Sequence, residues 1–264
     1  MANYYSPKEV AVIFKGTGLY KAELPVSKFA VLAILGGAFI ALGGLLAVIV
    51  AGGSPGIGEA NPGLIKFIAG ALFPVGLIMV SVSGADLFTS DCTAMTLPWL
   101  QKETGCRQFI KILSLSFFFN FIGTQIIAIF LTDYVHLIHG HTQAYLHDYV
   151  NHKMHQDFIT VLLKGIGANW LVCMGMWLGY SAKDLIGKSV GIWIPVMMFV
   201  TLGFEHSIAN MFFIPTAIYT GADITWGEFL IKNLLPATIG NVIGGVVFVG
   251  CAFWYTQMKG QPES

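Results

Sequence analysis

Charged residues are scarce in this chain. Asp, Glu, Lys and Arg make up 11% of the 264 residues and hydrophobic residues make up 55%, whereas about a quarter of a soluble domain is charged. The mean hydropathy is +0.72. This composition excludes an ordinary soluble domain and predicts an integral membrane protein. The formal net charge of zero gives no support to a nucleic-acid partner.

Clustered metal ligands and nucleotide-binding glycine motifs are missing as well. The four cysteines are scattered, with no C-x-x-C pair and no metal-site spacing, and we expect them to be packing residues: Cys92, Cys106, Cys173 and Cys251. No His, Cys, Asp and Glu cluster with metal spacing lies inside the apolar segments. We therefore predict no metal and no other cofactor, and these absences argue against a membrane enzyme.

The hydrophobic residues are grouped into six apolar segments. Four have the length of one crossing, for which about 20 residues suffice: 29–50, 108–131, 158–181 and 229–255. The other two, 64–100 and 189–219, are too long for one crossing, and each is interrupted by polar residues. We expect loops at 52–62 and at 133–157, the latter holding six of the seven histidines. The predicted fold is an all-α membrane protein in which the second and fifth segments are broken helices.

The most informative stretch lies in the middle of the fifth segment. It carries Glu205, His206 and Asn210, and no Lys or Arg occurs between Lys188 and Lys232. Ionisable groups at the centre of a membrane are costly, and they usually face a bundle interior or a water-filled cavity. We interpret this stretch as the centre of a transport pathway.

The two halves of the chain repeat each other. GAD at 84–86 parallels GFE at 203–205, and NFIG at 120–123 parallels NVIG at 241–244. Because each half has three crossings, the second half must be inverted relative to the first. Inverted repeats with one broken helix each place a substrate site at their interface near the midplane.

The basic residues predict the orientation. With both termini inside, ten of the fourteen Lys and Arg residues fall on the cytoplasmic side. Residues 1–27 form an amphipathic segment that lies at the interface through Val10, Val12, Ile13 and Phe14. A single transmembrane domain at 28–258 and a tail at 259–264 complete the predicted organisation.

Four motifs together resemble the formate/nitrite transporter family. They are GADLFTS at 84–90, NWLVC at 169–173, GFEHSIANM at 203–211 and TIGN at 238–241. They occur in the family's order, and the resemblance extends from the first apolar segment to Tyr255. It implies an aquaporin-like protomer of six helices, a homopentamer in the inner membrane with one pore per protomer, and passage of formate, nitrite or hydrosulfide, often with protons.

The resemblance also implies roles for individual residues. His206 corresponds to the central pore histidine, Thr89 to the loop residue that bonds near it, and Lys153 to the vestibule lysine. Five side chains correspond to the two apolar constrictions: Phe73, Leu77, Leu87, Phe88 and Phe199.

The physical chemistry of these residue types suggests how an anion would cross. A cationic Lys153 concentrates anions, and the apolar slit disfavours their charged form, so the neutral acid passes. His206 donates a proton or a hydrogen bond; the alternative is a buried histidine without substrate contact. Glu205 and Asn210 are expected to orient His206 or to satisfy the ends of the broken helix.

Other polar residues have mainly structural interpretations. We expect Asp86, like Glu205, to bond loop backbone, because an acid facing the pathway would repel an anion. Thr89 is also a candidate N-cap of a half-helix. Lys164 snorkels or pairs, and Asn169 forms interhelical hydrogen bonds.

Formate transport, passive or proton-coupled, is the function that the sequence favours. A nitrite or hydrosulfide channel of the same architecture is the alternative, because these pores share most residues. An aquaporin-like channel for neutral solutes is disfavoured, since no paired Asn-Pro-Ala motifs occur. Without an ATP-binding motif, transport is expected to run on gradients.

Overall fold

The computed structural model describes residues 3–260, and these residues fold into an all-α protein. Its helices are α1 (Pro7–Glu23), α2 (Val26–Gly52), α3 (Pro55–Ala60), α4 (Pro62–Leu72), α5 (Val75–Ser83), α6 (Phe88–Ala94), α7 (Thr96–Leu100), α8 (Cys106–Ile127), η1 (Ala128–Tyr134), α9 (Gly140–Met154), α10 (Phe158–Ser181), α11 (Leu185–Thr201), α12 (Ser207–Tyr219), α13 (Trp226–Glu228), η2 (Phe229–Leu234), α14 (Leu235–Ile243), η3 (Gly244–Cys251) and α15 (Ala252–Gln257). The η elements are π-helical turns: η1 continues α8, η2 leads from α13 into α14, and η3 continues α14.

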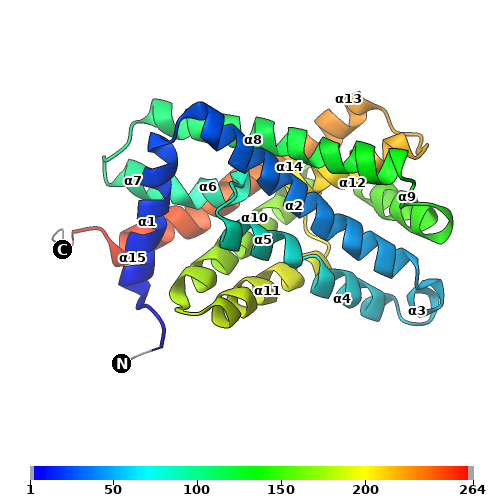
Figure 1. Ribbon diagram of the computed structural model, residues 1–264, viewed down its shortest axis with the longest axis horizontal. Helices are drawn as coiled ribbons and strands as arrows, with labels where there is room; N and C mark the ends of the chain where they lie inside the picture. Colours follow the sequence, from blue (N-terminus) through cyan, green and yellow to red (C-terminus); the bar gives the residue numbers. More distant parts are fainter. Residues whose placement is uncertain (1–2, 261–264) are drawn as a thin grey trace.

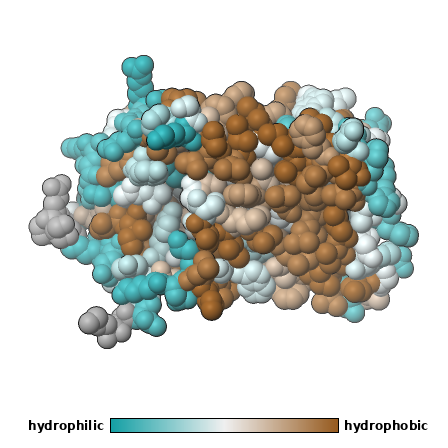
Figure 2. Space-filling view, viewed as in Figure 1, coloured by the Kyte–Doolittle hydropathy of each residue, from teal (hydrophilic) through white to brown (hydrophobic). Residues whose placement is uncertain are grey.

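Within residues 3–260, five stretches of helix are long and apolar enough to cross a membrane: Val26–Gly52, Pro62–Ser83, Cys106–Tyr134, Phe158–Ser181 and Trp226–Gln257. The predicted fifth segment consists instead of two shorter apolar helices, α11 and α12. Figure 2 shows a broad hydrophobic area across the middle of one face of the molecule, with hydrophilic residues gathered toward both ends of the long axis. This distribution fits a protein whose long axis crosses the bilayer.

The helices at the two ends of the molecule come from different parts of the chain. Figure 1 places α1, α7 and α15 at one end and α3, α9 and α13 at the other, with the long helices running between them. The first and last described helices therefore share one end. This agrees with an even number of crossings.

The N-terminal helix α1 packs against the protein rather than lying free at the interface. Its start is fixed by a capping box, in which Ser6 Oγ accepts from the Glu9 N–H at 3.4 Å and the Ser6 N–H donates to the Glu9 carboxylate at 2.7 Å. Val10 and Phe14 are buried, and the Phe14 ring meets that of Tyr180 in α10 at 4.9 Å. Of the four residues predicted to contact the interface, Val10 and Phe14 are therefore inside the protein, whereas Val12 is 47% exposed.

Two predicted loops contain helices. Residues 52–62 hold the short α3, and residues 133–157 hold α9, which has 15 residues. The buried face of α9 is hard to recognise in the sequence. It consists of Leu146, Val150 and Lys153, which are separated along the chain by mostly polar residues. Their spacing of four and three residues is that of one helix face. Of the predicted tail at 259–264, residues 261–264 lie outside the described part of the chain.

Both breaks use the same backbone device. Gly84 after α5 and Gly203 after α11 have φ angles of 75° and 68°, a left-handed conformation that glycine adopts without a steric penalty. Leu87 and His206 are then extended and act as the N-caps of α6 and α12. The first break is short, because the chain is helical again from Phe88 onward.

Candidate functional site

Each break is held by one buried asparagine from a later helix of the same half. Asn120 in α8 accepts from the Phe88 N–H at 2.9 Å and donates to the Asp86 carbonyl at 2.9 Å. Asn241 in α14 accepts from the Ser207 N–H at 2.8 Å and donates to the Glu205 carbonyl at 2.9 Å. Each amide thus satisfies backbone groups that a broken helix leaves unpaired.

His206 connects the two halves of the chain. Its Nδ1 accepts from the Ala209 N–H at 3.0 Å, which caps α12, and its Nε2 lies 3.1 Å from Thr89 Oγ1 in α6. Because Nδ1 accepts a hydrogen bond, we assign the ring hydrogen of a neutral imidazole to Nε2. Nε2–H then donates to the Thr89 hydroxyl. Protonating Nδ1 would break the cap, so this geometry favours a neutral hydrogen-bond donor.

Aromatic rings cover one face of His206. The Phe199 ring is stacked on the imidazole with centroids 5.7 Å apart, and Phe73 meets Phe199 edge-on at 5.9 Å. Phe213 of α12 lies 6.3 Å from Phe73. A small cavity of about 10 Å³, which we call the slit, is lined by these three rings and by His206, and Lys153 and Asn210 also reach it. The space beside the histidine is therefore narrow and mostly apolar.

A cavity of about 530 Å³, which we call the vestibule, adjoins this slit. The two cavities share Phe73, Tyr149, Lys153 and Phe213 in their linings. The vestibule is also lined by titratable residues from several elements: Lys66, Asp148, His152, Lys164 and Glu205. Three lysines thus face two carboxylates, which leaves an excess of positive charge over a wide opening that narrows toward His206.

Lys153 does not act there as an isolated charge. Its amine lies 3.0 Å from Glu205 Oε2, and both side chains are almost completely buried. Burial alone would lower the pKa of Lys153, but the Glu205 carboxylate outweighs this effect and raises that pKa above its usual value. Asn210 donates to the same carboxylate oxygen at 2.7 Å, and Gln156 donates to the other at 3.2 Å.

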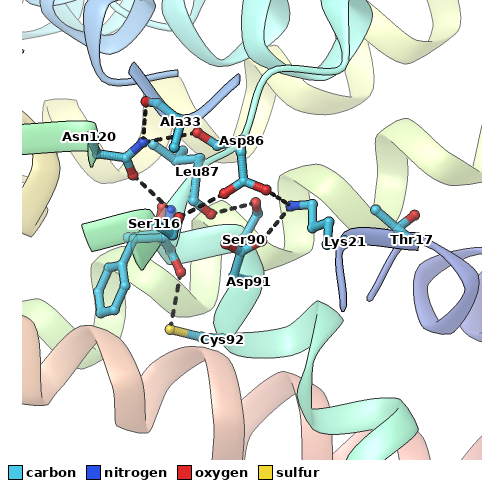
Figure 3. A network of polar contacts seen from close by, with 12 residues as sticks. Thr17, Lys21, Ala33, Asp86, Leu87, Ser90, Asp91, Cys92, Ser116 and Asn120 are labelled. Atoms are coloured by element: carbon cyan, nitrogen blue, oxygen red, sulfur yellow. Dashed lines mark hydrogen bonds and ion pairs between the residues drawn. The ribbon is translucent and has the colours of Figure 1, made fainter. Parts of the chain in front are cut away.

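In the first half, Asp86 corresponds to Glu205 and has its own partners (Figure 3). Ser116 Oγ donates to Asp86 Oδ1 at 2.7 Å, and the Lys21 amine of α1 lies 3.0 Å from Asp86 Oδ2. The prediction that Asp86 and Glu205 bond loop backbone is wrong for their carboxylates. Other side chains bind the carboxylate oxygens, and Asn120 and Asn241 form the hydrogen bonds to the loop backbone.

Comparison with known proteins identifies the family. The family model described as formate/nitrite transporter matches residues 8–255. The chain belongs to this family. A probable formate transporter of Methanothermobacter thermautotrophicus is 38% identical over 98% of this chain and 99% of its own length. The resemblance read from the four motifs is thereby confirmed, and the chain is a membrane transport protein rather than an enzyme.

Two solved structures share the fold. An FNT family ion channel superposes with a TM-score of 0.83 at 26% identity, over 95% of this chain and 98% of that one. A second structure, of a pentameric formate channel with formate bound, has a TM-score of 0.77 at 29% identity over 89% of this chain and 98% of that one. The all-α membrane fold predicted from the sequence is confirmed.

The transporter fold brings some of the predicted site residues together and separates others. His206, Phe73 and Phe199 line the slit, and Thr89 is hydrogen-bonded to His206. Lys153 lines both the slit and the vestibule. Four other predicted residues are not in the linings of these two cavities, and their part in the pathway stays a prediction. Leu77 is buried in α5, Leu87 precedes α6, Phe88 packs against Phe117 at 5.0 Å, and Asn169 donates to the Asn241 carbonyl at 2.7 Å.

Two expectations about supporting residues need correction. Thr89 is not an N-cap, because Leu87 occupies that position and Thr89 Oγ1 is bonded to His206. Asn210 donates to Glu205, and Glu205 pairs with Lys153, so His206 is oriented instead by its own cap bond to Ala209.

Sequence reasoning missed four residues around the two cavities. Phe213 and Tyr149 line both cavities, and Lys66 and Lys164 line the vestibule. Tyr149 precedes Lys153 by one helical turn, and the Lys153 amine lies 4.9 Å from the centre of the Tyr149 ring. That spacing would have indicated a shared helix face if residues 133–157 had been interpreted as a helix.

Proposed function

We propose that this protein carries small monovalent anions of weak acids across the membrane, with formate as the principal substrate. One observation carries the proposal: a vestibule with excess positive charge narrows through Phe73, Phe199 and Phe213 onto the paired donors His206 and Thr89. The similarity to a probable formate transporter and to a channel solved with formate supports the choice of formate.

Anion capture begins in the vestibule. Lys66 and Lys164 line it, and no ion pair to either is found among the described residues. Their charges raise the local concentration of anions. Lys153 contributes less of this attraction, because Glu205 neutralises it at 3.0 Å. Its role is to hold the second break against α9, so that the slit keeps its width.

Passage through the slit requires removal of the anion's charge. The rings around His206 offer no compensation for the lost hydration of an anion, and burial raises the proton affinity of a carboxylate. The substrate therefore takes a proton from a hydronium ion in the vestibule, which leaves a water molecule behind, and crosses as the neutral acid. His206 Nε2–H and the Thr89 hydroxyl supply hydrogen bonds to it on the way.

The assembly and orientation form part of the same proposal. The chain works as a homopentamer of six-crossing, inverted-repeat protomers in the inner membrane, with residues 28–258 as one transmembrane domain and both termini inside. The pentameric solved relative, the shared end of α1 and α15 and the distribution of basic residues support this arrangement. The surface carries many exposed apolar side chains that would contact lipid or a neighbouring protomer.

Flux measurements on purified protein in liposomes test the proposal. Formate, nitrite and hydrosulfide are compared across a pH series, with protein-free liposomes as the control. We expect formate to move fastest and an inward proton gradient to accelerate it. Faster nitrite or hydrosulfide flux would replace formate as the substrate, and equal flux of all three at every pH would contradict passage as the neutral acid.

A further inference from the structure

Two carboxylates share one lysine where α1 meets the first break (Figure 3). The Lys21 amine lies 3.0 Å from Asp86 Oδ2 and also bonds Asp91 Oδ1. The side chains of Asp86 and Asp91 are 2% and 0% exposed, and that of Lys21 is 11% exposed. If both acids were ionised, the cluster would carry a net negative charge away from water, which is costly.

The second half of the chain shows how such a cluster is balanced. There Lys153 faces Glu205, and the residue five positions after the acid is Asn210, which donates to the carboxylate at 2.7 Å. In the first half, the residue five positions after Asp86 is Asp91. The same position thus holds a neutral donor in one half and a second acid in the other.

Among the described residues, Lys21 is the one cation that pairs with Asp91. Its Oδ2 is buried and has no hydrogen-bond partner among the described residues. Ser116 of α8 donates to Asp86, and Lys15, on the same helix as Lys21, is paired with Glu103 at 2.6 Å. The other titratable groups that interact with the cluster are uncharged at neutral pH: Tyr180 of α10 and the thiols of Cys92 and Cys173. The Lys188 amine of α11 lies over the Tyr180 ring, 5.6 Å from its centre, and forms no ion pair with either aspartate among the described residues.

We propose that Asp86 and Asp91 bind one proton between them at neutral pH, with Asp91 as its carrier. Two acids at one buried site do not both ionise, because the first charge opposes the second. One shared proton leaves Lys21 balanced by one carboxylate, which reproduces the neutral balance of Lys153 and Glu205. A neutral Asp91 also leaves no uncompensated charge on its unpartnered oxygen.

The bound proton lies beside the pathway. Asp91 is two residues from Thr89 in α6, and its partner Lys21 belongs to α1, which lies at one end of the molecule (Figure 1). Loss of the proton to a base places a negative charge there, which repels an anion in the slit. If the proposed function holds, alkaline pH on the α1 side therefore slows entry from that side.

Infrared spectroscopy of the purified full-length protein tests for the proton directly. Asp86 and Asp91 are the buried aspartates of the described part of the chain, so a protonated-carboxyl stretch at neutral pH that shifts with isotope-labelled aspartate reports this pair. We expect that band in the wild type, and absence of it would overturn the proposal. The spectrum needs no transport, so the result is independent of the proposed function.

Three variants locate the proton. Asp91→Asn should lack the band, and Asp223→Asn, at an exposed loop position, should keep it. Asn210→Asp places a second acid beside Lys153 and should add a band. A band that survives in Asp91→Asn would overturn the assignment. If that variant fails to fold, the isotope shift in the wild type still decides whether the pair holds a proton.

Discussion

Leu87 and His206 occupy equivalent positions in the two halves of the molecule. Each follows the acid of its break, each is extended, and each is the N-cap of the next helix. The N–H that follows each one is bound by an asparagine side chain, at 2.9 Å for Phe88 and 2.8 Å for Ser207. The backbone is thus symmetric while the chemistry is not, since only the second half places a ring nitrogen at this point.

Replacing His206 by Asn tests that ring nitrogen. Asn is a good helix cap, so α12 should keep its N-terminus. The hydrogen bond from Nε2 to Thr89 is lost, and we expect formate flux in liposomes to fall roughly tenfold, the rate equivalent of about 1.4 kcal/mol. Full flux at acidic and neutral pH would show that His206 is a buried histidine without a role in transport.

Thr89 offers a matched pair of substitutions. Thr89→Val keeps the shape but removes the hydroxyl that lies 3.1 Å from His206 Nε2, and Thr89→Ser keeps the hydroxyl. We expect formate flux to fall several-fold in the Val variant and to remain near the wild-type value in the Ser variant. Equal flux in the two variants would exclude the hydroxyl from the pathway.

Lys153→Met should lower stability. The change leaves the fully buried Glu205 carboxylate without its cation, and removal of one partner of a buried ion pair costs about 3–5 kcal/mol. Thermal unfolding in detergent should show the loss, and adding Glu205→Gln should recover part of it. An unchanged melting temperature in the single variant would mean that water or another cation replaces the lysine.

Lys164→Met provides the contrast. Lys164 lines the vestibule, is half-buried and forms no ion pair among the described residues, so we expect unchanged thermal stability. The formate concentration at half-maximal flux should rise, and flux should depend less on ionic strength, because one attracting charge is gone. Concentration series at low and high salt measure both effects, and an unchanged salt dependence would remove Lys164 from anion capture.

The asparagines that hold the breaks should be essential to stability. Asn241→Ala removes three side-chain hydrogen bonds, to Gly165, Glu205 and Ser207, and leaves buried backbone groups unpaired. We expect a loss on the order of 3 kcal/mol in thermal or denaturant unfolding. Asn61→Ala, at an exposed position without a side-chain cap bond, is the control and should change little.

The parts of the fold that depend on local patterns were predictable from the sequence. The apolar run at 158–181 coincides with α10, and polar residues within the two long apolar runs indicated the breaks near Gly84 and Gly203. The repeated Asn-x-x-Gly motifs indicated that Asn120 and Asn241 play equivalent parts, which their hydrogen bonds bear out. Hydropathy is a property of neighbouring residues, and a repeat is found by comparing one part of the chain with another. Neither requires knowledge of which residues meet in the folded protein.

The electrostatic partners were not predictable. Lys21 bonds Asp91 across 70 positions and Lys153 bonds Glu205 across 52, and nothing in the local sequence indicates such pairs. The family resemblance implies a vestibule lysine at Lys153 whose charge attracts anions, and the sequence predicts a loop at 133–157. Once residues 140–154 form a helix, its buried face turns the same lysine into a structural ion-pair partner.

The asparagine that holds each break also imposes an order on biosynthesis. Asn241 follows Ser207 by 34 positions, and Asn120 follows Phe88 by 32. Each half-helix therefore leaves the ribosome before the residue that satisfies its first amide and the carbonyl ahead of it. Until the last helix of that half is inserted, the broken segment has polar backbone groups that lipid cannot satisfy. The two breaks are consequently the last features of their halves to take their final form.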